Sequence, residues 1–328
     1  MEALPTVESI EAADVRDDVA ALLSGCEHMV CQVRTAEGLV RIPVSCRGTG
    51  PPLLLLHGHP QSRVIWHRLL PELARHFSVV LTDLRGYGDA DSPADAPGAA
   101  PHSAQGKRAM AADQVAVMSA LGHPAFAVVG HDRGARVAHR MGLDWPARIR
   151  AMMLLDIAPT LSMLEQTDLA FASAYWHWFF LVQPAPFPER MIAADPQAWL
   201  QGLMGNRIKG PSPFAEAAWR EYLHHLGRPQ IVHSICEDYR AAAGSDAELD
   251  RADRDRGHRL SCRLRVHWGA EGIIGRLYNP LSEWRAACHD DVRVDGGPMP
   301  CGHYLPEQAP QAVLASVLDD WYPGQAEV

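Results

Sequence analysis

Residues 125–145 read AFAVVGHDRGARVAHRMGLDW, and they carry the strongest indication of the fold in the chain. Its first seven residues form an apolar run typical of a buried strand, and residues 133–143 follow a helical pattern. Between them, Gly130-His131-Asp132-Arg133-Gly134 fits the nucleophile-elbow pattern G-x-S-x-G, with aspartate in the place of serine. Small residues at both ends of such a turn let strand and helix meet tightly and hold the central side chain exposed. A surface turn can match the same five positions by chance, so the assignment depends on the rest of the chain.

Apolar runs alternate with helical patterns along most of the chain, which is typical of a mostly parallel sheet. Eight strands are expected, at 28–34, 39–45, 52–58, 77–83, 125–131, 150–156, 264–269 and 291–297. Amphipathic helices are expected at 61–75, 107–121, 133–143 and 307–320. The sequence therefore predicts an α/β fold with an eight-stranded sheet flanked by helices.

The segment from Pro159 to about Arg259 breaks this alternation. It has no strand-like apolar run and is rich in Trp, His, Tyr and Ala. We therefore predict a helical cap inserted after strand 6, over the carboxyl ends of the strands, where open α/β sheets bind ligands. The first 24 residues are acidic and polar, which predicts a short helical or disordered arm. The expected domains are an arm (1–24), a core (25–158 and 260–328) and a cap (159–259).

Composition argues against several classes of protein. The net charge of -9 argues against nucleic acid, because binding nucleic acid needs a basic face. The apolar runs are too short to span a bilayer, and the first 24 residues lack the basic and apolar regions of a secretory signal. The seven cysteines are scattered without a CxxC spacing, which favours a reducing cytoplasm. Neither a metal nor a cofactor is expected.

Aspartate at the elbow changes the chemistry that this turn can perform. A carboxyl group with a reference pKa of about 3.9 is already ionised at neutral pH and needs no base to activate it. Asp132 can displace a leaving group from a saturated carbon and form an ester whose carbonyl lies on the enzyme side, where water can attack it. The residue therefore predicts alkyl transfer followed by ester hydrolysis, and it argues against ordinary ester or amide cleavage.

Hydrolysis of such an ester needs a general base near neutral pH, and histidine is the natural choice. Elbow enzymes order their residues along the chain as nucleophile, acid, histidine, which selects His303 in the Gly/Pro-rich loop before the last helix. The alternative is a capping or surface histidine. Asp156, at the end of the strand 150–156, is the preferred acid, and Glu271 after the next strand is the second choice. Either acid would orient His303 and stabilise its protonated form.

Two arginines follow the nucleophile on the same side of the expected helix, at Arg133 and Arg136. The helix dipole disfavours a cation in the first turn, so their presence there suggests a purpose. Two guanidinium groups beside a nucleophile would grip a substrate carboxylate, with arginine providing bidentate geometry. The alternative is that one or both pair with core carboxylates such as Asp83.

At this point the chain resembles the haloacetate dehalogenases, which include the fluoroacetate dehalogenases and belong to the α/β-hydrolase superfamily. The resemblance covers nearly the whole chain after about residue 28. It rests on HGHPQSRVIWHRLLPEL (57–73), TDLRGYGDADSP (82–93), GHDRGARVAHRMGLDWP (130–146), LLDIAPT (154–160), YWHWFFLVQPAPFPE (175–189), CEDYRAA (236–242) and GHYLPEQAP (302–310). Several of these motifs are long and lie in the expected cap, which makes the match specific.

The resemblance implies that Asp132 displaces halide from the α-carbon of a haloacetate, while Arg133 and Arg136 hold the substrate carboxylate. His303, supported by Asp156, would activate the water that releases glycolate. Fluoroacetate, chloroacetate or both are the expected substrates. Homodimers are common in the family, so the resemblance also implies that two copies of this chain can form a homodimer.

The resemblance also assigns the residues around the leaving group. His177, Trp178 and Tyr239 match the family's halide-binding trio, and their N–H and O–H groups can replace the solvation of a departing halide. Without the resemblance, the run YWHWFF would be interpreted as an aromatic core stripe. Backbone N–H groups of His59 and Arg133 would form the oxyanion hole for ester hydrolysis.

This chain departs from the family pattern in HGHP, where His59 stands in the place of an aromatic residue, usually Phe. That residue is expected near the substrate, which puts the pocket shape and pH behaviour in question. Ala90 replaces a common Ser, and the N-terminal arm is longer than usual.

Two competing functions remain. An epoxide hydrolase would use Asp132 and His303 in the same way, with Tyr175, Tyr222 or Tyr239 protonating the epoxide oxygen. Paired arginines count against it, because a neutral epoxide gives them nothing to bind. A non-catalytic binding protein for a small carboxylate would keep the arginines but would need no base.

Overall fold

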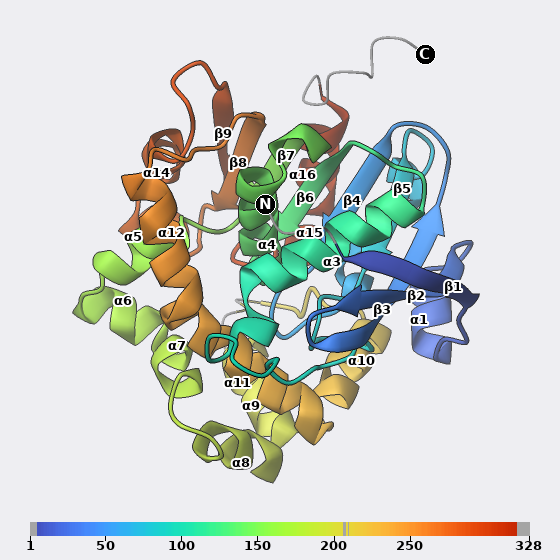
Figure 1. The fold of residues 1–328 in the computed structure, drawn as a ribbon, viewed down its shortest axis with the longest axis horizontal. Coiled ribbons are helices and arrows are strands. Elements are labelled where there is room, and N and C mark those ends of the chain that lie inside the picture. Colours follow the sequence, from blue (N-terminus) through green and yellow to red (C-terminus); the bar gives the residue numbers. More distant parts are fainter. Residues whose placement is uncertain (1–4, 206–207, 209, 320–328) are drawn as a thin grey trace.

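A computed structural model describes residues 5–205, 208 and 210–319. Within them, nine strands form one sheet in the order β1-β2-β3-β5-β4-β6-β7-β8-β9 (Figure 1). The pairs from β5 through β9 are parallel, whereas β1, β2, β3 and β5 pair antiparallel. The strands are β1 (Thr6–Ala12), β2 (Glu27–Thr35), β3 (Gly38–Arg47), β4 (Pro52–Leu56), β5 (Ser78–Thr82), β6 (Phe126–His131), β7 (Ile149–Leu155), β8 (Arg263–Gly269) and β9 (Val294–Met299). The predicted α/β fold is confirmed, and the predicted strand number is wrong by one.

The additional strand comes from the N-terminal arm. We predicted a helical or disordered segment, but Thr6–Ala12 forms β1, which pairs antiparallel with β2 from Thr6 opposite Arg34 to Ala12 opposite Met29. The short helix α1 (Asp17–Leu22) follows it. Exposed side chains alternate with half-buried ones over the first part of β1, so the segment buries little apolar surface. Its strand conformation depends on backbone hydrogen bonds to β2, which the sequence of the segment does not reveal.

Core helices flank the sheet largely where the sequence places them. Two predicted helices are continuous, α3 (Lys107–Ala120) and α4 (Arg133–Asp144), and Figure 1 shows both in front of the strands. The other two predicted helices are broken into short pieces. These are η1 (Arg63–Trp66) with α2 (Leu70–Leu73), and α15 (Leu305–Gln308) with α16 (Pro310–Leu318). Residue 320, the predicted end of the last helix, lies outside the described residues. The remaining short helices are η2 (Ser103–Gln105), η3 (Pro146–Arg148), α13 (Ile274–Leu277) and α14 (Pro280–Ala286).

The chain between β7 and β8 is helical in its described residues, as predicted for the cap. Figure 1 shows these helices gathered at one end of the sheet. They follow the seventh strand instead of the sixth, because β1 adds one to the count. The helices are α5 (Thr160–Glu165), α6 (Leu169–Ala174), α7 (Trp176–Leu181), α8 (Phe187–Ala194), α9 (Pro196–Leu203), α10 (Glu216–Leu226), α11 (Pro229–Ala243) and α12 (Ser245–Asp255).

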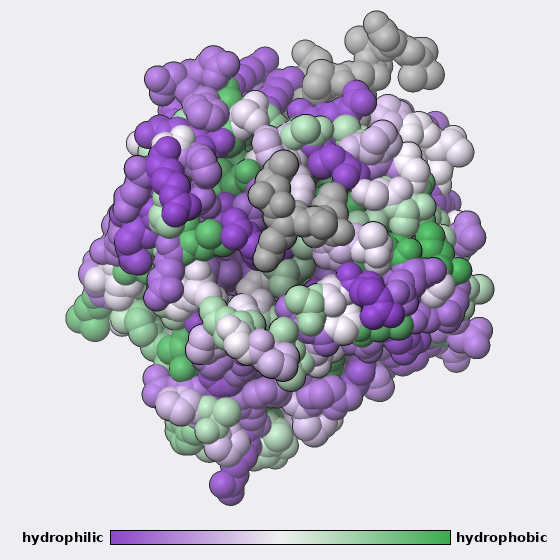
Figure 2. Space-filling model, in the orientation of Figure 1, coloured by the Kyte–Doolittle hydropathy of each residue, from purple (hydrophilic) through white to green (hydrophobic). Residues whose placement is uncertain are grey.

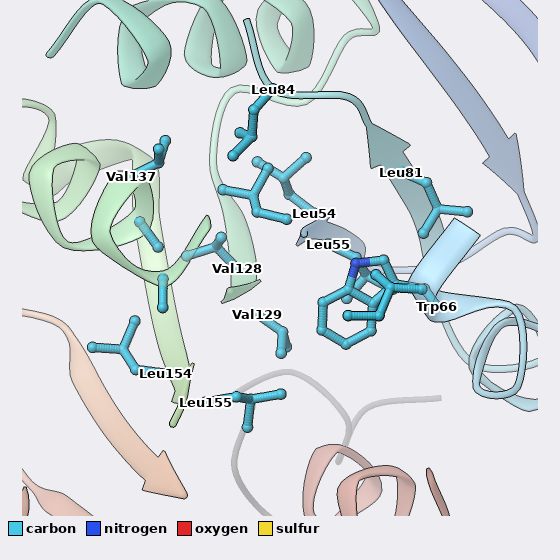
Figure 3. Close-up of a cluster of buried hydrophobic side chains, with 14 of the residues drawn as sticks. Leu54, Leu55, Trp66, Leu81, Leu84, Val128, Val129, Val137, Leu154 and Leu155 are labelled. Atoms are coloured by element: carbon cyan, nitrogen blue, oxygen red, sulfur yellow. The ribbon is translucent and has the colours of Figure 1, made fainter. Parts of the chain in front are cut away.

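The central strands are continuous apolar runs because helices cover both faces of the parallel part of the sheet. Side chains from β4, β6 and β7 meet those of α4 and η1 in one cluster (Figure 3). Leu54, Val128 and Leu154 have no exposed surface. Burying a side chain of this size stabilises the fold by roughly 1.5 to 3 kcal/mol. This rigid base fixes the strand ends from which the site residues extend.

Outside the core, the face seen in Figure 2 is mostly hydrophilic, with hydrophobic residues in small groups. In the described part of the chain, no helix has the length and apolar character needed to cross a membrane. All seven cysteines are present as free thiols.

Candidate active site

The turn between β6 and α4 places Asp132 at the carboxyl edge of the sheet. Its backbone has φ 50° and ψ −115°, a conformation that residues with a side chain rarely adopt. A Cβ added at Gly130 would lie 2.6 Å from the Ala135 Cα, and one at Gly134 would lie 2.3 Å from the backbone oxygen of His57. The glycine spacing of the motif therefore has a steric reason, since strand and helix approach too closely for any side chain at either position.

The Asp132 carboxylate is nearly buried and is held by the backbone. Its Oδ1 accepts a hydrogen bond from the His59 N–H at 2.9 Å, and its Oδ2 lies 3.8 Å from the His303 Nε2. Burial alone would raise the pKa of Asp132, but the neighbouring His303, His131, Arg133 and Arg136 outweigh it and lower that pKa. The group is therefore ionised at neutral pH, as a carboxylate nucleophile must be.

His303 lies in the loop between β9 and α15 and is oriented by Asp156. The His303 Nδ1 donates to the Asp156 Oδ2 at 2.6 Å, and the other carboxylate oxygen accepts the Gly269 N–H at 2.9 Å. Because Nδ1 carries the proton, Nε2 is free to act as a base on the side of Asp132. Of the two acids that the sequence left open, Asp156 contacts His303, whereas Glu271 is exposed.

Arg133 is fully buried, and most of its guanidinium is already engaged by a protein carboxylate. Its Nε donates to the Asp238 Oδ2 at 2.7 Å and its Nη2 to the Asp238 Oδ1 at 2.6 Å. The third nitrogen, Nη1, is buried and has no hydrogen-bond partner among the described residues. The alternative of pairing with a core carboxylate thus holds for two of the three nitrogens, although the partner is Asp238 and not Asp83.

Arg136 contrasts with Arg133, because its charge meets no carboxylate within 4.0 Å in the part of the chain that the structure describes. Its Nη1 donates to the Thr160 hydroxyl at 2.7 Å and to the Ala158 carbonyl at 3.2 Å, and its Nε is buried without a hydrogen-bond partner. The suggested partner Asp83 instead pairs with Arg63. Burial and then the charge of Arg133 lower the pKa of Arg136. A buried cation of this kind gains from an anionic ligand.

The three aromatic residues assigned to the leaving group lie together, each about one-twentieth exposed or less. The ring of Tyr239 on α11 lies 6.0 Å from that of His177 and 6.1 Å from that of Trp178, both on α7. The guanidinium carbons of the two arginines face this trio, Arg133 at 4.2 Å from the Tyr239 ring and Arg136 at 4.9 Å from the Trp178 ring. The trio therefore lies beside the two arginines that follow Asp132 in the chain.

His59 also lies in this wall and is 4% exposed. Its ring centroid is 5.5 Å from that of Tyr239 and 6.2 Å from that of Tyr87, in edge-to-face geometry. An edge-to-face contact of this kind is equally open to phenylalanine. The imidazole thus occupies the wall position that the family pattern gives to an aromatic ring.

Sequence reasoning missed several residues that support this site. Asp238 precedes Tyr239 in the quoted motif CEDYRAA, yet no role was given to it. His131, inside the elbow, donates from Nε2 to the backbone carbonyl of His303 at 2.8 Å, and burial followed by the nearby His303 lowers its pKa to about 4. Glu307, in the motif after His303, is buried and accepts from the Gln61 amide at 2.5 Å. The available signal was the presence of charged residues among apolar ones in these motifs. Such residues are rarely buried unless they are paired, so each of them indicates a buried partner.

Fold and site together are those of the α/β hydrolases, and the chain belongs to this family, because residues 51–225 match the family described as alpha/beta hydrolase fold. Within it, the chain belongs to the haloacetate dehalogenases, hydrolases that act on carbon–halide bonds. It is 40% identical over 287 residues to a fluoroacetate dehalogenase of Burkholderia sp., covering 86% of this chain and 92% of the relative.

Two further relatives place the chain in a wider group. It is 29% identical over 280 residues to a soluble epoxide hydrolase of Corynebacterium sp. (strain C12), covering 84% of this chain and 92% of the relative. A solved structure from Nostoc sp. PCC 7120, assigned to the α/β hydrolases, is 46% identical with a TM-score of 0.84 and covers 90% of this chain and 97% of its own. The fold and the hydrolytic class are shared across the group, whereas the substrates named in it differ.

Proposed function

We propose that this hydrolytic dehalogenase converts haloacetates, fluoroacetate or chloroacetate, to glycolate and halide. The observation that carries the proposal is Arg136, a buried cation near the Asp132 carboxylate with no carboxylate partner among the described residues. A substrate carboxylate supplies the missing counter-charge, and the α-carbon attached to it then lies near the nucleophile.

In the first step, Asp132 attacks the α-carbon with Oδ2, because Oδ1 is held by the His59 N–H. The new C–O bond forms as the carbon–halogen bond breaks, and the halide leaves with the bonding electron pair. His177, Trp178 and Tyr239 offer an imidazole N–H, an indole N–H and a phenol O–H to the departing ion. These donors replace the solvation that a halide would have in water.

In the second step, His303 Nε2 takes a proton from water, and the hydroxide attacks the ester carbonyl carbon of Asp132. Negative charge develops on the oxygen already bonded to the His59 N–H, and the backbone N–H of Arg133 at the start of α4 can contribute to the same hole. Asp156 stabilises the imidazolium that forms. When the intermediate collapses, the bond between the Asp132 carboxyl carbon and Oδ2 breaks, and Oδ2 takes the proton from the His303 imidazolium and leaves in glycolate. The oxygen from water stays in the Asp132 carboxylate.

The epoxide hydrolase is the second candidate, and the Corynebacterium relative favours it. Among the cap tyrosines that could protonate an epoxide oxygen, the Tyr222 hydroxyl already donates to Glu307 at 3.1 Å. Tyr175 and Tyr239 lie in the wall with His177. A neutral epoxide leaves Arg136 without a counter-charge, so the haloacetate is preferred. A non-catalytic carboxylate receptor does not need the His303–Asp156 pair.

Halide release from fluoroacetate and chloroacetate, measured side by side with an ion-selective electrode and a glycolate assay, tests the proposal. We expect release of halide and an equal amount of glycolate, and no release by Asp132→Asn. Release of chloride alone would restrict the substrate to the weaker carbon–halogen bond. Release of neither halide together with hydrolysis of styrene oxide would replace the proposal by the epoxide hydrolase.

We further propose that residues 159–259 act as the cap that closes this site, and that two chains pair through it. Large apolar side chains are exposed on α6, α7 and α8, namely Leu169, Trp176, Phe179, Phe187 and Met191. Clusters of exposed apolar residues are typical of contact surfaces. Light scattering should give a dimer that Leu169→Asp with Phe187→Asp dissociates, and a monomeric wild type would contradict the pairing.

A further inference from the structure

Asp238 on α11 is buried at the meeting point of several donors. It accepts two hydrogen bonds from the Arg133 guanidinium, at 2.7 and 2.6 Å, and one from the Tyr87 hydroxyl at 2.6 Å. The Lys107 ammonium donates to the same carboxylate. Its backbone carbonyl also accepts from the Arg133 Nη2 at 3.0 Å. A carboxylate with this many charge-assisted bonds has one fixed orientation, and so do its partners.

The donors and the acceptor come from different parts of the chain. Arg133 begins α4, Lys107 begins α3, and Tyr87 follows β5, all in the core, whereas Asp238 belongs to a helix between β7 and β8. The next residue on α11 is Tyr239, which lies in the wall of the site. One side-chain cluster therefore fixes both where α11 docks and where the Tyr239 hydroxyl is presented.

The pairing also determines which part of Arg133 faces a ligand. Two of its nitrogens are bonded to Asp238, and Nη1 alone is left buried and without a hydrogen-bond partner in the described chain. The Nε of the nearby Arg136 is also buried and has no hydrogen-bond partner among the described residues. Each arginine thus has one buried N–H group that can donate to a ligand. The sequence suggested instead that each guanidinium would bind a carboxylate with two parallel hydrogen bonds. Groups that are held in place before binding lose less entropy when the ligand arrives.

Arg133 is not the only cation that shares the Asp238 carboxylate. Asp238 alone would cancel the charge of Arg133, but Lys107 shares the same carboxylate, so two cations face one anion. The next carboxylate is Asp246, whose Oδ2 lies 3.9 Å from the Lys107 Nζ. Burial raises the pKa of Asp246, and burial followed by the charge of Arg133 lowers the pKa of Lys107. On the other side, Arg136 and Asp132 complete the set of nearby charges.

We propose that Asp238 is a positioning residue that holds Arg133 so that only Nη1 binds the substrate carboxylate, with the Arg136 Nε as the second ligand. This inference rests on the proposed function and deepens it, because it says how a carboxylate as small as that of haloacetate is held. Two single N–H contacts from two rigid arginines suit a small ligand, since neither guanidinium has to rotate when the substrate enters.

The first experiment compares Asp238→Asn with Tyr87→Phe, which removes a bond to the same carboxylate without touching Arg133. In Asp238→Asn we expect KM for chloroacetate to rise about tenfold or more, with a smaller change in kcat, because the guanidinium loses its anchor. Tyr87→Phe should keep KM within about threefold of the wild type. Equal rises in KM in both variants, matched by equal losses in Tm, would reduce Asp238 to a residue that only docks the cap.

A double-mutant comparison separates positioning from stability. In an Arg133→Met background, Asp238→Asn should add no further rise in KM, because there is no guanidinium left to hold. An additional rise as large as in the wild-type background would overturn the proposal. If Asp238→Asn alone fails to fold, the double variant is still compared with Arg133→Met, since replacing both members of a buried pair is tolerated better than replacing one. A KM in the double variant well above that of Arg133→Met would then overturn the proposal.

Acetate provides a readout that does not depend on turnover, because it carries the carboxylate and no leaving group. Its dissociation constant, measured by calorimetry, should rise about tenfold or more in Asp238→Asn and stay within about threefold in Tyr87→Phe. Unchanged acetate binding in Asp238→Asn would contradict the positioning role even if the wild type releases halide. Weakened acetate binding without any halide release would support the role of Asp238 and reject the proposed reaction.

Discussion

Single residues decide the chemistry of this site through their partners. Asp132 is kept ionised by positive neighbours, and His303 carries its proton on Nδ1 because Asp156 accepts it at 2.6 Å. The division of labour follows from these contacts. In the proposed reaction, Asp132 forms an ester without help, whereas breaking that ester needs the unprotonated Nε2 of His303. Removing each residue should therefore stop the reaction at a different stage.

Replacing His303 by alanine should leave alkylation intact and block hydrolysis. After exposure to chloroacetate, the variant is expected to gain the mass of one carboxymethyl group, located on Asp132 by peptide mapping. Intact-mass spectrometry measures the gain, and the double variant His303→Ala with Asp132→Asn is the control that should gain none. An unmodified His303→Ala protein under the same conditions would exclude the two-step mechanism.

Arg136→Ala should lower kcat/KM for haloacetate by about a hundredfold or more, because the buried N–H donors opposite the substrate carboxylate are lost. Stability should change much less, since no carboxylate partner among the described residues is left unpaired. Arg150→Ala, at an exposed arginine of β7, is the matched control and should behave like the wild type. Steady-state kinetics and thermal unfolding of both variants provide the measurement. Unchanged kinetics in Arg136→Ala would contradict the proposal that Arg136 binds the substrate carboxylate.

At the scale of elements, the elbow depends on the close approach of β6 and α4 to the neighbouring strand β4. A Cβ on Gly134 would lie 2.3 Å from the His57 carbonyl oxygen and 2.6 Å from that of Leu56. These are backbone atoms at the end of a buried strand, so they cannot yield as a flexible side chain would. The position of Asp132 is thus a property of three packed elements and not of the turn alone.

Gly134→Ala should therefore destabilise the fold by roughly 2 kcal/mol or more and abolish turnover, because α4 must move away from β4. Gly202→Ala on α9 is the control, since a Cβ there would meet no heavy atom within 4 Å. Alanine has the higher helix propensity, so that variant should be unchanged or slightly more stable. Urea unfolding of the two proteins distinguishes these outcomes, and equal stability would contradict the steric argument.

At the scale of the whole molecule, the N-terminal arm joins the core to the helical segment. Arg16 donates to Asp89 in the core at 2.8 and 2.9 Å, and to Glu221 on α10, which is 2% exposed. Close by, Arg220 on α10 donates to Asp18 in α1 at 2.6 Å. The arm thus links α10 to the core through ion pairs and pairs with the sheet through β1.

Arg16→Ala should lower the free energy of unfolding by roughly 3 kcal/mol, because it leaves the buried Glu221 without its cation. The matched control is Arg34→Ala, which breaks an exposed pair with Glu8 and should cost less than about 1 kcal/mol. Chemical denaturation at low and moderate salt is the measurement. Equal losses in the two variants would show that the arm does not secure α10 through Arg16.

A second link across the molecule gives a pH dependence. Glu307 accepts from Tyr222 on α10 and from Gln61, two residues after His59, and burial raises its pKa to about 8. The native state thus keeps a proton that the unfolded state loses above a pKa of about 4.5. Its contribution to stability declines as the pH rises from about 4.5 to about 8 and is constant above that.

Glu307→Gln cannot ionise, so it should escape this decline. Its stability relative to the wild type is expected to increase by roughly 3 to 5 kcal/mol between pH 5 and pH 9. Thermal unfolding across this pH range measures the difference, with the exposed Glu271→Gln as the control that should show none. A difference that is constant with pH would contradict the assignment of a protonated Glu307.

Features that depend on local pattern could be predicted from the amino-acid sequence. Apolar runs marked the central strands, the glycine spacing marked the elbow, and the residue type at Asp132 indicated alkyl transfer. The predictions for the N-terminal arm and for two of the helices were wrong. The pairing of β1 with β2, and the breaks in the helices that contain α2 and α15, depend on residues that are distant in the chain. Weak local propensity is routinely overridden by such contacts.

Which charged side chains meet could be seen only after the chain had folded. Asp156, and not Glu271, reaches His303, and Asp238, and not Asp83, holds Arg133. These partners are separated by more than a hundred residues along the chain, so no local spacing encodes them. The physical reason is that the energy of a buried charge depends on the few atoms around it, and those atoms come together only when the core and the helical segment are docked.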